Sequence, residues 1–170
     1  GGPLRVSHLG HTAPMTRAWL KTMQGMGIPY TSDFNAGEPR GVGLMQHTMD
    51  WERRRRCSPV DAFLNPVRSE PNFTLRTQAT VESVLFEGTR AVGVSWIESG
   101  QKHEARAGEV ILAAGAYQTP KLLMLSGIGP EAELARHAVP MRVSLPGVGE
   151  NLQDHYECPV VATTKGAFGY

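Results

Sequence analysis

A run of small residues after an apolar segment is the first feature of this sequence that could serve chemistry. Val110–Ala114 is apolar without alternation, as expected for a strand buried on both faces, and Gly115 ends it. The small residues Ala113, Ala114 and Gly115 would let a flat or extended ligand approach the main chain, and ligands of open α/β folds lie at the carboxyl ends of strands. The segment indicates either a ligand-binding bend or a tight strand-to-helix turn without a ligand, and the pattern alone leaves both open.

Side chains that could act as an acid, a base or a nucleophile are few. Asp154 and His155 are an acid and a possible base, but neighbours along a chain usually point apart, so structural hydrogen bonding near a turn is favoured. His47 has no partner nearby in the sequence, and Ser126 lacks the G-x-S-x-G context of an activated serine. The six histidines and two cysteines show no CxxC or HxxxH spacing, which gives a metal site little support. The sequence therefore predicts no catalytic group.

Two patterns bear on phosphate binding. Residues Gly127–Ala132 formally fit the dinucleotide fingerprint G-x-G-x-x-[GA], but a helix is expected before them where the fingerprint requires a strand. We therefore interpret Gly127 as a helix stop and expect no phosphate cradle there. We interpret the four consecutive arginines Arg53–Arg56 as a solvated turn before the next helix. The alternative is a basic patch that binds a cofactor pyrophosphate or an anionic surface.

The sequence predicts two helices in the first part of the chain. One is predicted over Pro14–Met26, with Thr12 as its cap and Gly27 after its end. Its apolar residues recur at helical spacing and are expected in the core, namely Met15, Trp19, Leu20 and Met23. The other begins at Ser58–Asp61 and closes at Pro66. The remaining predicted segments are a loop over Asp33–Gly43 and strands over Leu4–His8 and Leu44–Met49.

From Asn72 the apolar period changes to two, which predicts a meander of short antiparallel strands. The strands are expected over Phe73–Thr77, Thr80–Phe86, Ala91–Ile97 and Lys102–Ala107. After the apolar segment, a helix is expected with Thr119 as cap and Pro120 as its first residue, and another over Pro130–His137. A short strand over Met141–Val143 then leads into a turn-rich segment.

The composition is that of a globular chain of about one domain. Its 170 residues are 41% hydrophobic and 19% charged, and a net charge of +1 gives no bulk attraction to nucleic acid or membrane. Apolar runs fall short of the roughly 20 residues of a membrane-spanning helix. Cys57 and Cys158 are expected as free thiols, with a disulfide as the alternative. We expect an internal piece of a longer polypeptide, in the cytoplasm.

Several blocks of the sequence resemble the glucose-methanol-choline (GMC) oxidoreductases. Gly115–Gly129 is similar to the family's second signature, with its small residues, Thr-Pro step, aliphatic pair and terminal S-G-x-G. Leu145–His155 resembles the block that follows, and Arg56–Leu64 resembles a helix start upstream. Asp33–Asn35 with Gly41–Gly43 also fits. The resemblance covers essentially the whole chain, in order.

The resemblance implies a mixed α/β fold. Part of an FAD-binding, Rossmann-like domain with an antiparallel meander would be joined to the edges of an antiparallel-sheet substrate domain. Residues 1–51 would be a substrate-domain edge and connecting segment, 52–145 the middle of the FAD-binding domain, and 146–170 the return into the substrate domain. By similarity, Val81 matches the position whose backbone meets the adenine of FAD. Ala114 and Gly115 match the strand end that faces the cofactor.

The activity implied by the resemblance is hydride transfer from a small alcohol to FAD, as in choline and other alcohol dehydrogenases or oxidases. The family's N-terminal G-x-G-x-x-G is absent, and so is the C-terminal part that carries its catalytic histidine. This segment alone is therefore expected neither to hold FAD tightly nor to turn over substrate. The rest of the polypeptide, or a complementing chain, would supply the missing pieces. Two alternatives are a hydroxynitrile lyase of the same family and a non-catalytic truncated module.

Overall fold

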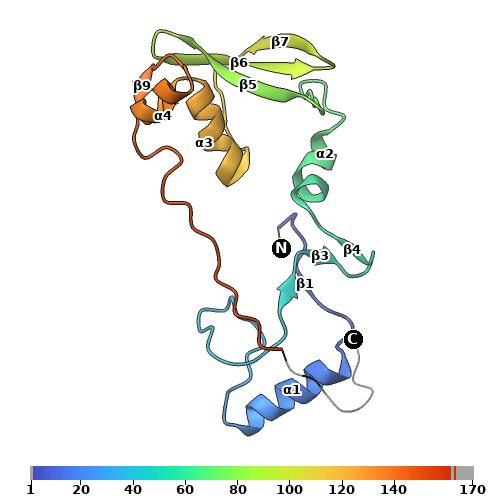
Figure 1. The fold of residues 1–170 in the computed structure, drawn as a ribbon. Coiled ribbons are helices and arrows are strands. Elements are labelled where there is room, and N and C mark those ends of the chain that lie inside the picture. The colour runs from blue at the N-terminus through green and yellow to red at the C-terminus, as the bar shows by residue number, and fades with distance from the viewer. Residues whose placement is uncertain (1, 162, 164–170) are drawn as a thin grey trace. The chain divides into compact units, whose positions relative to one another are not determined.

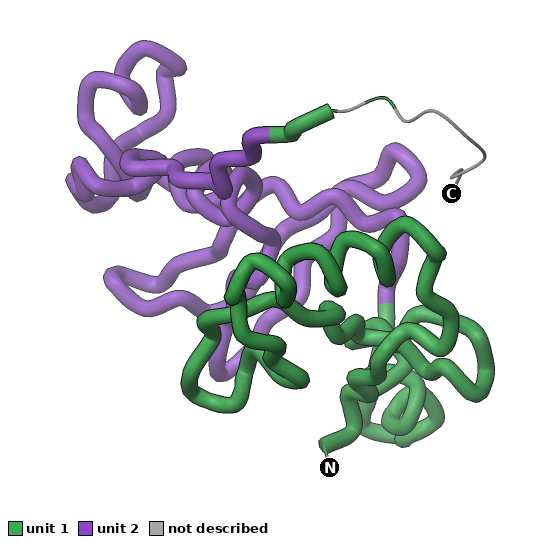
Figure 2. Tube along the Cα trace, turned by 90° about the horizontal axis from the view of Figure 1, so that it is seen from below, with its two compact units in different colours: residues 1–75, 159–170 green, residues 76–158 purple. Residues whose placement is uncertain are grey.

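The computed structural model describes residues 2–161 and 163, which fall into two compact units (Figure 2). Unit 1 comprises residues 1–75 together with 159–170, and unit 2 comprises residues 76–158. The domain boundaries implied by the resemblance, after residues 51 and 145, stay a prediction.

Unit 1 is built from one long helix, short strand pairs and a broken helix (Figure 1). Its elements are β1 (Ser7–His8), α1 (Pro14–Gly25), β2 (Gln46–His47), β3 (Met49–Asp50), β4 (Arg55–Arg56), the π-helical turn η1 (Val60–Leu64) and α2 (Asn65–Val67). Strand β1 pairs antiparallel with β2, and β3 pairs antiparallel with β4. The two predicted strands are therefore confirmed only as pieces two residues long.

Helix α1 begins at Pro14 as predicted, but its cap and its core face differ from the prediction. Ala13 occupies the cap position and makes no side-chain hydrogen bond, so Thr12 as the cap is wrong. Leu20 is buried, whereas Met15 and Trp19 are exposed. The rest of unit 1 therefore covers only part of the apolar face of α1. The buried part of this face is narrower than the spacing of the apolar residues predicts.

The second helix starts close to the predicted position, with Pro59 rather than Ser58 at the cap position of η1, and continues past the expected end. The hydroxyl and backbone N–H of Ser58 both donate to Asp61 Oδ2, at 2.7 and 3.0 Å, and the backbone N–H of Asp61 lies 3.3 Å from Ser58 Oγ. This reciprocal contact satisfies donors at the start of the helix. Pro66 does not close the helix, because it stands in the first turn of α2, where N–H groups have no intrahelical acceptor and none is missed.

Unit 2 contains a three-stranded antiparallel sheet and two helices. Its elements are β5 (Thr80–Glu87), β6 (Arg90–Glu98), β7 (Gln101–Arg106), α3 (Gly115–Leu125), β8 (Ile128–Gly129), α4 (Glu131–Arg136) and β9 (Val143–Ser144). The sheet order β5-β6-β7 confirms the predicted meander. Ser99 and Gly100 both have positive φ, which is the hairpin geometry that suits two-residue loops.

Two predicted strands are wrong. Phe73–Thr77 and Val110–Ala114 belong to no strand, and Ile111 is 80% exposed. A strand buried on both faces needs a hydrogen-bonded neighbour on its edge, and no strand of the described residues pairs with either segment. The apolar composition of Val110–Ala114 predicts a strand in a sheet, but the segment does not lie in one.

The helix after this segment starts earlier than predicted. Helix α3 begins at Gly115, and Pro120 lies inside it rather than at its first position. Thr119 Oγ1 accepts the backbone N–H of Ala114 at 3.0 Å, so this threonine satisfies a donor before the helix without being its cap residue. Gly127 follows the end of α3, which confirms that a helix and not a strand precedes the G-x-G-x-x-[GA] match.

The last elements of unit 2 are the β8–β9 pair and helix α4. Strand β8 pairs in parallel with β9, and α4 confirms the helix predicted over Pro130–His137. Leu122 of α3 and Leu134 of α4 are buried, together with Val84 and Val92 of the sheet. The core of unit 2 thus lies between the meander and the two helices. None of the described helices has the length and apolar character to cross a membrane.

Candidate functional site

The backbone at Gly115 is open to solvent, at the position where the sequence predicts that a ligand can approach the main chain. Gly115, the first residue of α3, has φ of +85°, and a Cβ built on it would meet no heavy atom within 4 Å. Ala114 precedes it with its side chain exposed. A glycine takes this conformation without strain, and the absence of a side chain leaves open space over the backbone. A planar ligand could therefore lie against this turn.

Val81 stands on the other element singled out by the sequence. It is the second residue of β5, is 38% exposed, and lies opposite Trp96 of β6. Strand β5 is at the edge of the three-stranded sheet, and the register shifts between Val81 and Ser83. An edge strand leaves one row of N–H and C=O groups without strand partners. The backbone near Val81 can therefore offer hydrogen bonds outside the sheet.

A buried serine joins the two elements. Ser126 Oγ accepts the backbone N–H of Val84 at 2.9 Å and donates to the carbonyl of Leu122 at 2.7 Å. Ser126 is 6% exposed and directly follows α3, so its hydroxyl ties the helix that begins at Gly115 to the strand that carries Val81. Local spacing could not predict this contact, because Val84 lies 42 residues from Ser126 in the sequence. Its role is structural, and this agrees with the missing context of a nucleophile.

A cavity of about 340 Å³ opens beside this link. Phe86 of β5, Arg106 of β7 and Arg142 line part of it, and the Arg142 guanidinium lies 5.3 Å above the Phe86 ring. Neither Val81 nor the bend at Ala114–Gly115 lines this cavity. Val81, Ala114 and Gly115 are therefore exposed positions of unit 2 outside this cavity.

The remaining catalytic candidates do not assemble into a site. The backbone N–H of His155 donates to Asp154 Oδ1 at 2.8 Å, and both residues are exposed, which supports the structural interpretation of this pair. His47 lies on β2 and is exposed. Within residues 2–161 and 163, no cluster of His, Cys, Asp and Glu side chains is arranged to hold a metal ion. Cys57 is buried and Cys158 exposed, and both are free thiols as expected.

The family profile of GMC oxidoreductases matches residues 2–157. The chain belongs to this family. It is 45% identical over 157 residues to the mitochondrial choline dehydrogenase of Mus musculus, covering 92% of this chain and 26% of that protein. It is 40% identical over 167 residues to an alcohol dehydrogenase (acceptor) of Pseudomonas putida, covering 96% of this chain and 30% of that one.

A solved FAD-dependent oxidoreductase from Chaetomium thermophilum shares the fold of this GMC family member. The TM-score is 0.80 at 32% identity, with 86% of this chain and 26% of that chain covered. The predicted family and the mixed helix and antiparallel-sheet fold are therefore confirmed. The chain spans between a quarter and a third of the length of these relatives.

Proposed function

We propose that this chain is a segment of an FAD-dependent oxidoreductase that acts on the CH–OH group of a small alcohol. The family membership and the two dehydrogenase relatives support this proposal, and one of those relatives is named for choline. They favour a dehydrogenase or oxidase over the hydroxynitrile lyase and over a non-catalytic module. Bound FAD would supply the acceptor for a hydride from the alcohol carbon.

The observation that carries the proposal is the open backbone at the start of α3. The positive φ of Gly115 and the empty space where a Cβ would lie fit a cofactor that rests on main chain. Ala114 adds only a methyl group beside it. These two residues would hold FAD through backbone contacts, with no charged side chain needed from the turn.

The edge of β5 would hold the adenine end of the same cofactor. Backbone groups of Val81 on an unpaired sheet edge can hydrogen-bond a base without any polar side chain at that position. The Ser126 bond between β5 and α3 would keep the two contact regions in one rigid unit. The role of these residues is to bind and orient the cofactor, and no proton transfer is assigned to them.

The rest of the active site would come from other parts of the polypeptide or from a complementing chain. Among the residues that the structure describes, no catalytic group is brought into position, and the chain spans about a quarter of the length of the choline dehydrogenase relative. The isolated chain should therefore show no stoichiometric flavin spectrum when mixed with FAD. Tight binding by the isolated chain would contradict this part of the proposal.

The test of the function uses the complete polypeptide that contains this segment. We expect a protein-bound flavin spectrum after purification, and bleaching of the visible flavin absorption when an alcohol such as choline is added without oxygen. Flavin that stays oxidised with every alcohol tried would count against the dehydrogenase. Absence of flavin would overturn the cofactor proposal as well.

A matched pair of variants tests the predicted cofactor contact. Gly115→Leu fills the open space and strains the backbone, whereas Gly108→Leu adds the same side chain in equally open space without a positive φ. The first should lower the flavin-to-protein ratio of the complete polypeptide and the second should not. Far-UV circular dichroism of both variants checks that the fold is kept. Equal flavin content in both would remove Gly115 from the site.

A further inference from the structure

A small cavity in unit 1 brings four arginines together from two distant segments. Its volume is about 80 Å³, and it lies where the chain before β1 meets the β3–β4 hairpin and the start of η1. The charged residues that line it are Arg5, Arg53, Arg55, Arg56, Asp50 and Asp61. None of them belongs to the cofactor surface proposed above, which lies in unit 2.

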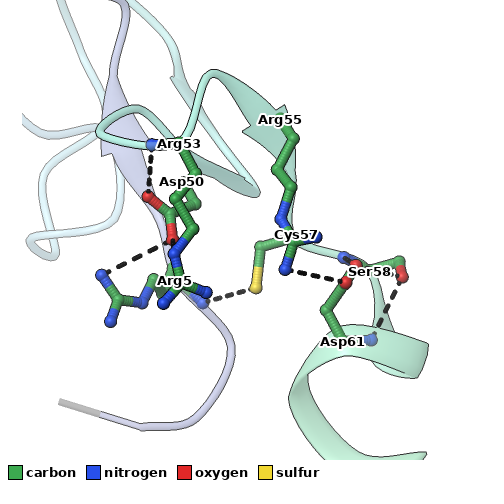
Figure 3. Close-up of polar contacts among 7 residues, drawn as sticks. All are labelled: Arg5, Asp50, Arg53, Arg55, Cys57, Ser58 and Asp61. Carbon is green, nitrogen blue, oxygen red and sulfur yellow. Dashed lines mark hydrogen bonds and ion pairs between the residues drawn. The ribbon is translucent and has the colours of Figure 1, made fainter. Parts of the chain in front are cut away.

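Two carboxylates hold three of these guanidinium groups in place (Figure 3). Asp50 is 5% exposed and lies 3.7 Å from Arg5 and 3.6 Å from Arg53. Asp61 lies 3.4 Å from Arg55 and is itself fixed by Ser58. A buried carboxylate that pairs with two arginines orients both of them, so the positive groups are positioned before any ligand arrives.

The charges around the cavity do not balance. Four guanidinium groups and two carboxylates line the cavity, and the exposed Glu52, which does not line it, lies 3.9 Å from Arg5. Counting Glu52, one positive charge is left in excess. Arg56 makes no ion pair with any described residue, and the side chains of Arg5, Arg53 and Arg55 are each more than half exposed. The solvated-turn interpretation accounts for the exposure of the arginines. It does not account for their convergence on one cavity with Arg5, about fifty residues away.

The wall of the cavity is fixed by the thiol of Cys57. The backbone N–H of Arg5 donates to Cys57 Sγ at 3.3 Å, and Cys57 is 7% exposed (Figure 3). The backbone N–H of Cys57 donates to the carbonyl of Thr48 at 3.0 Å. These contacts join the N-terminal segment to the hairpin and keep Arg5 beside the other arginines.

We propose that this cavity binds a phosphate group. Guanidinium groups present planar pairs of N–H donors that match the oxygens of phosphate, and the excess of positive charge favours an anion. Free inorganic phosphate and the phosphate of a nucleotide share this chemistry. The proposal does not depend on flavin binding or on the alcohol reaction.

Calorimetric titration of the chain with inorganic phosphate, at constant ionic strength set by chloride, tests the proposal. Arg56→Gln removes an arginine that lines the cavity and forms no ion pair with the described residues. It should weaken phosphate binding by about tenfold, because one charge-assisted hydrogen bond is lost. Arg54→Gln removes the same charge from the neighbouring position, which does not line the cavity, and should leave the affinity within about twofold. Equal losses in both variants, or no saturable binding by the natural chain, would overturn the site.

Amide chemical shifts of the ¹⁵N-labelled chain locate the bound ion independently. Saturable shifts at Arg5, Arg56 and Cys57 together are expected, because all three residues line the cavity. Shifts spread equally over exposed arginines elsewhere, such as Arg90 and Arg136, would show unspecific binding and contradict the proposal. A parallel titration with ADP separates the sources: tighter binding at the same amides assigns a nucleotide phosphate, and weaker binding assigns the free ion.

Discussion

The hydroxyl of Ser126 lies 2.9 Å from the backbone nitrogen of Val84, and this one hydrogen bond joins the end of α3 to the middle of strand β5. Both residues are buried. The same hydroxyl donates to Leu122 at 2.7 Å, so it closes the last turn of the helix while it accepts from the sheet. The buried Ser126 hydroxyl therefore fixes the position of α3 relative to β5, and the proposed cofactor surface depends on this position.

Ser126→Ala should destabilise the fold of unit 2. The substitution leaves the N–H of Val84 buried without a partner, and an unsatisfied buried donor costs about 1–3 kcal/mol. Urea unfolding followed by circular dichroism measures the loss as a lower midpoint. Ser144→Ala, at an exposed position of β9, is the control and should change the midpoint little. Equal effects of the two substitutions would mean that the buried bond adds no stability.

The meander was predictable because its signals are local. Alternating apolar residues over Thr80–Phe86 and Ala91–Ile97, with Gly88 and Gly100 between the strands, fix each hairpin from residues that are neighbours in sequence. A helix near Ser58–Asp61 was predictable for the same reason, since the two side chains that bond there are three residues apart.

The errors fall where structure depends on distant residues. Val110–Ala114 has the composition of a buried strand, but a strand forms only beside a partner, and composition cannot say whether one is present. The apolar stripe of α1 likewise shows which side chains could be covered, and Trp19 is not.

The site residues divide in the same way. Gly115 could be singled out because its small size is a local property. The pairing of Arg5 with Asp50, and of Ser126 with Val84, joins residues more than forty positions apart. No spacing rule within a helix or hairpin connects such pairs, so both had to come from the structure.

Gly10→Ala should displace the indole of Trp51. A Cβ on Gly10 would overlap the Cε2 and Nε1 atoms of the Trp51 indole. The indole N–H resonance of Trp51 should therefore move in an ¹⁵N correlation spectrum, while the resonances of Trp19 and Trp96 stay in place. Gly25→Ala has open space at its Cβ and should leave all three unchanged. An unshifted Trp51 in the Gly10 variant would contradict this packing.

Stability in acid should depend on Asp61. Hydrogen bonds from the Ser58 side chain and backbone, and the nearby Arg55 charge, lower the pKa of the Asp61 carboxyl from its usual 3.8. A folded-state pKa below the unfolded value means that the ionised carboxylate stabilises the fold. This contribution is complete above about pH 4 and is lost as the pH falls through the lowered folded-state value.

The pH dependence of thermal unfolding checks this expectation. Asp61→Asn should lower Tm relative to the natural chain at pH 6, and the difference should shrink below about pH 4 as the natural carboxyl takes up its proton. Glu70→Gln removes an exposed carboxylate that makes no side-chain hydrogen bond or ion pair with the described residues and should give a smaller difference at pH 6. A Tm difference for Asp61→Asn that is constant with pH would show that ionisation is not involved.

Gly115→Ala should destabilise the fold through the backbone alone. The φ of +85° is strained for a residue with a Cβ, and a left-handed conformation costs an ordinary L-residue about 1–2 kcal/mol. No clash contributes, since the added methyl group would meet no atom within 4 Å. Gly108→Ala, which has equally open space and no positive φ, should be neutral or slightly stabilising, because alanine restricts the unfolded chain. Both substitutions add a methyl group in open space, so a lower urea midpoint for the first and not for the second would assign the cost to the positive φ of Gly115. Equal midpoints would mean that the turn relaxes to an ordinary conformation, and the open main chain proposed to face the cofactor would not be maintained.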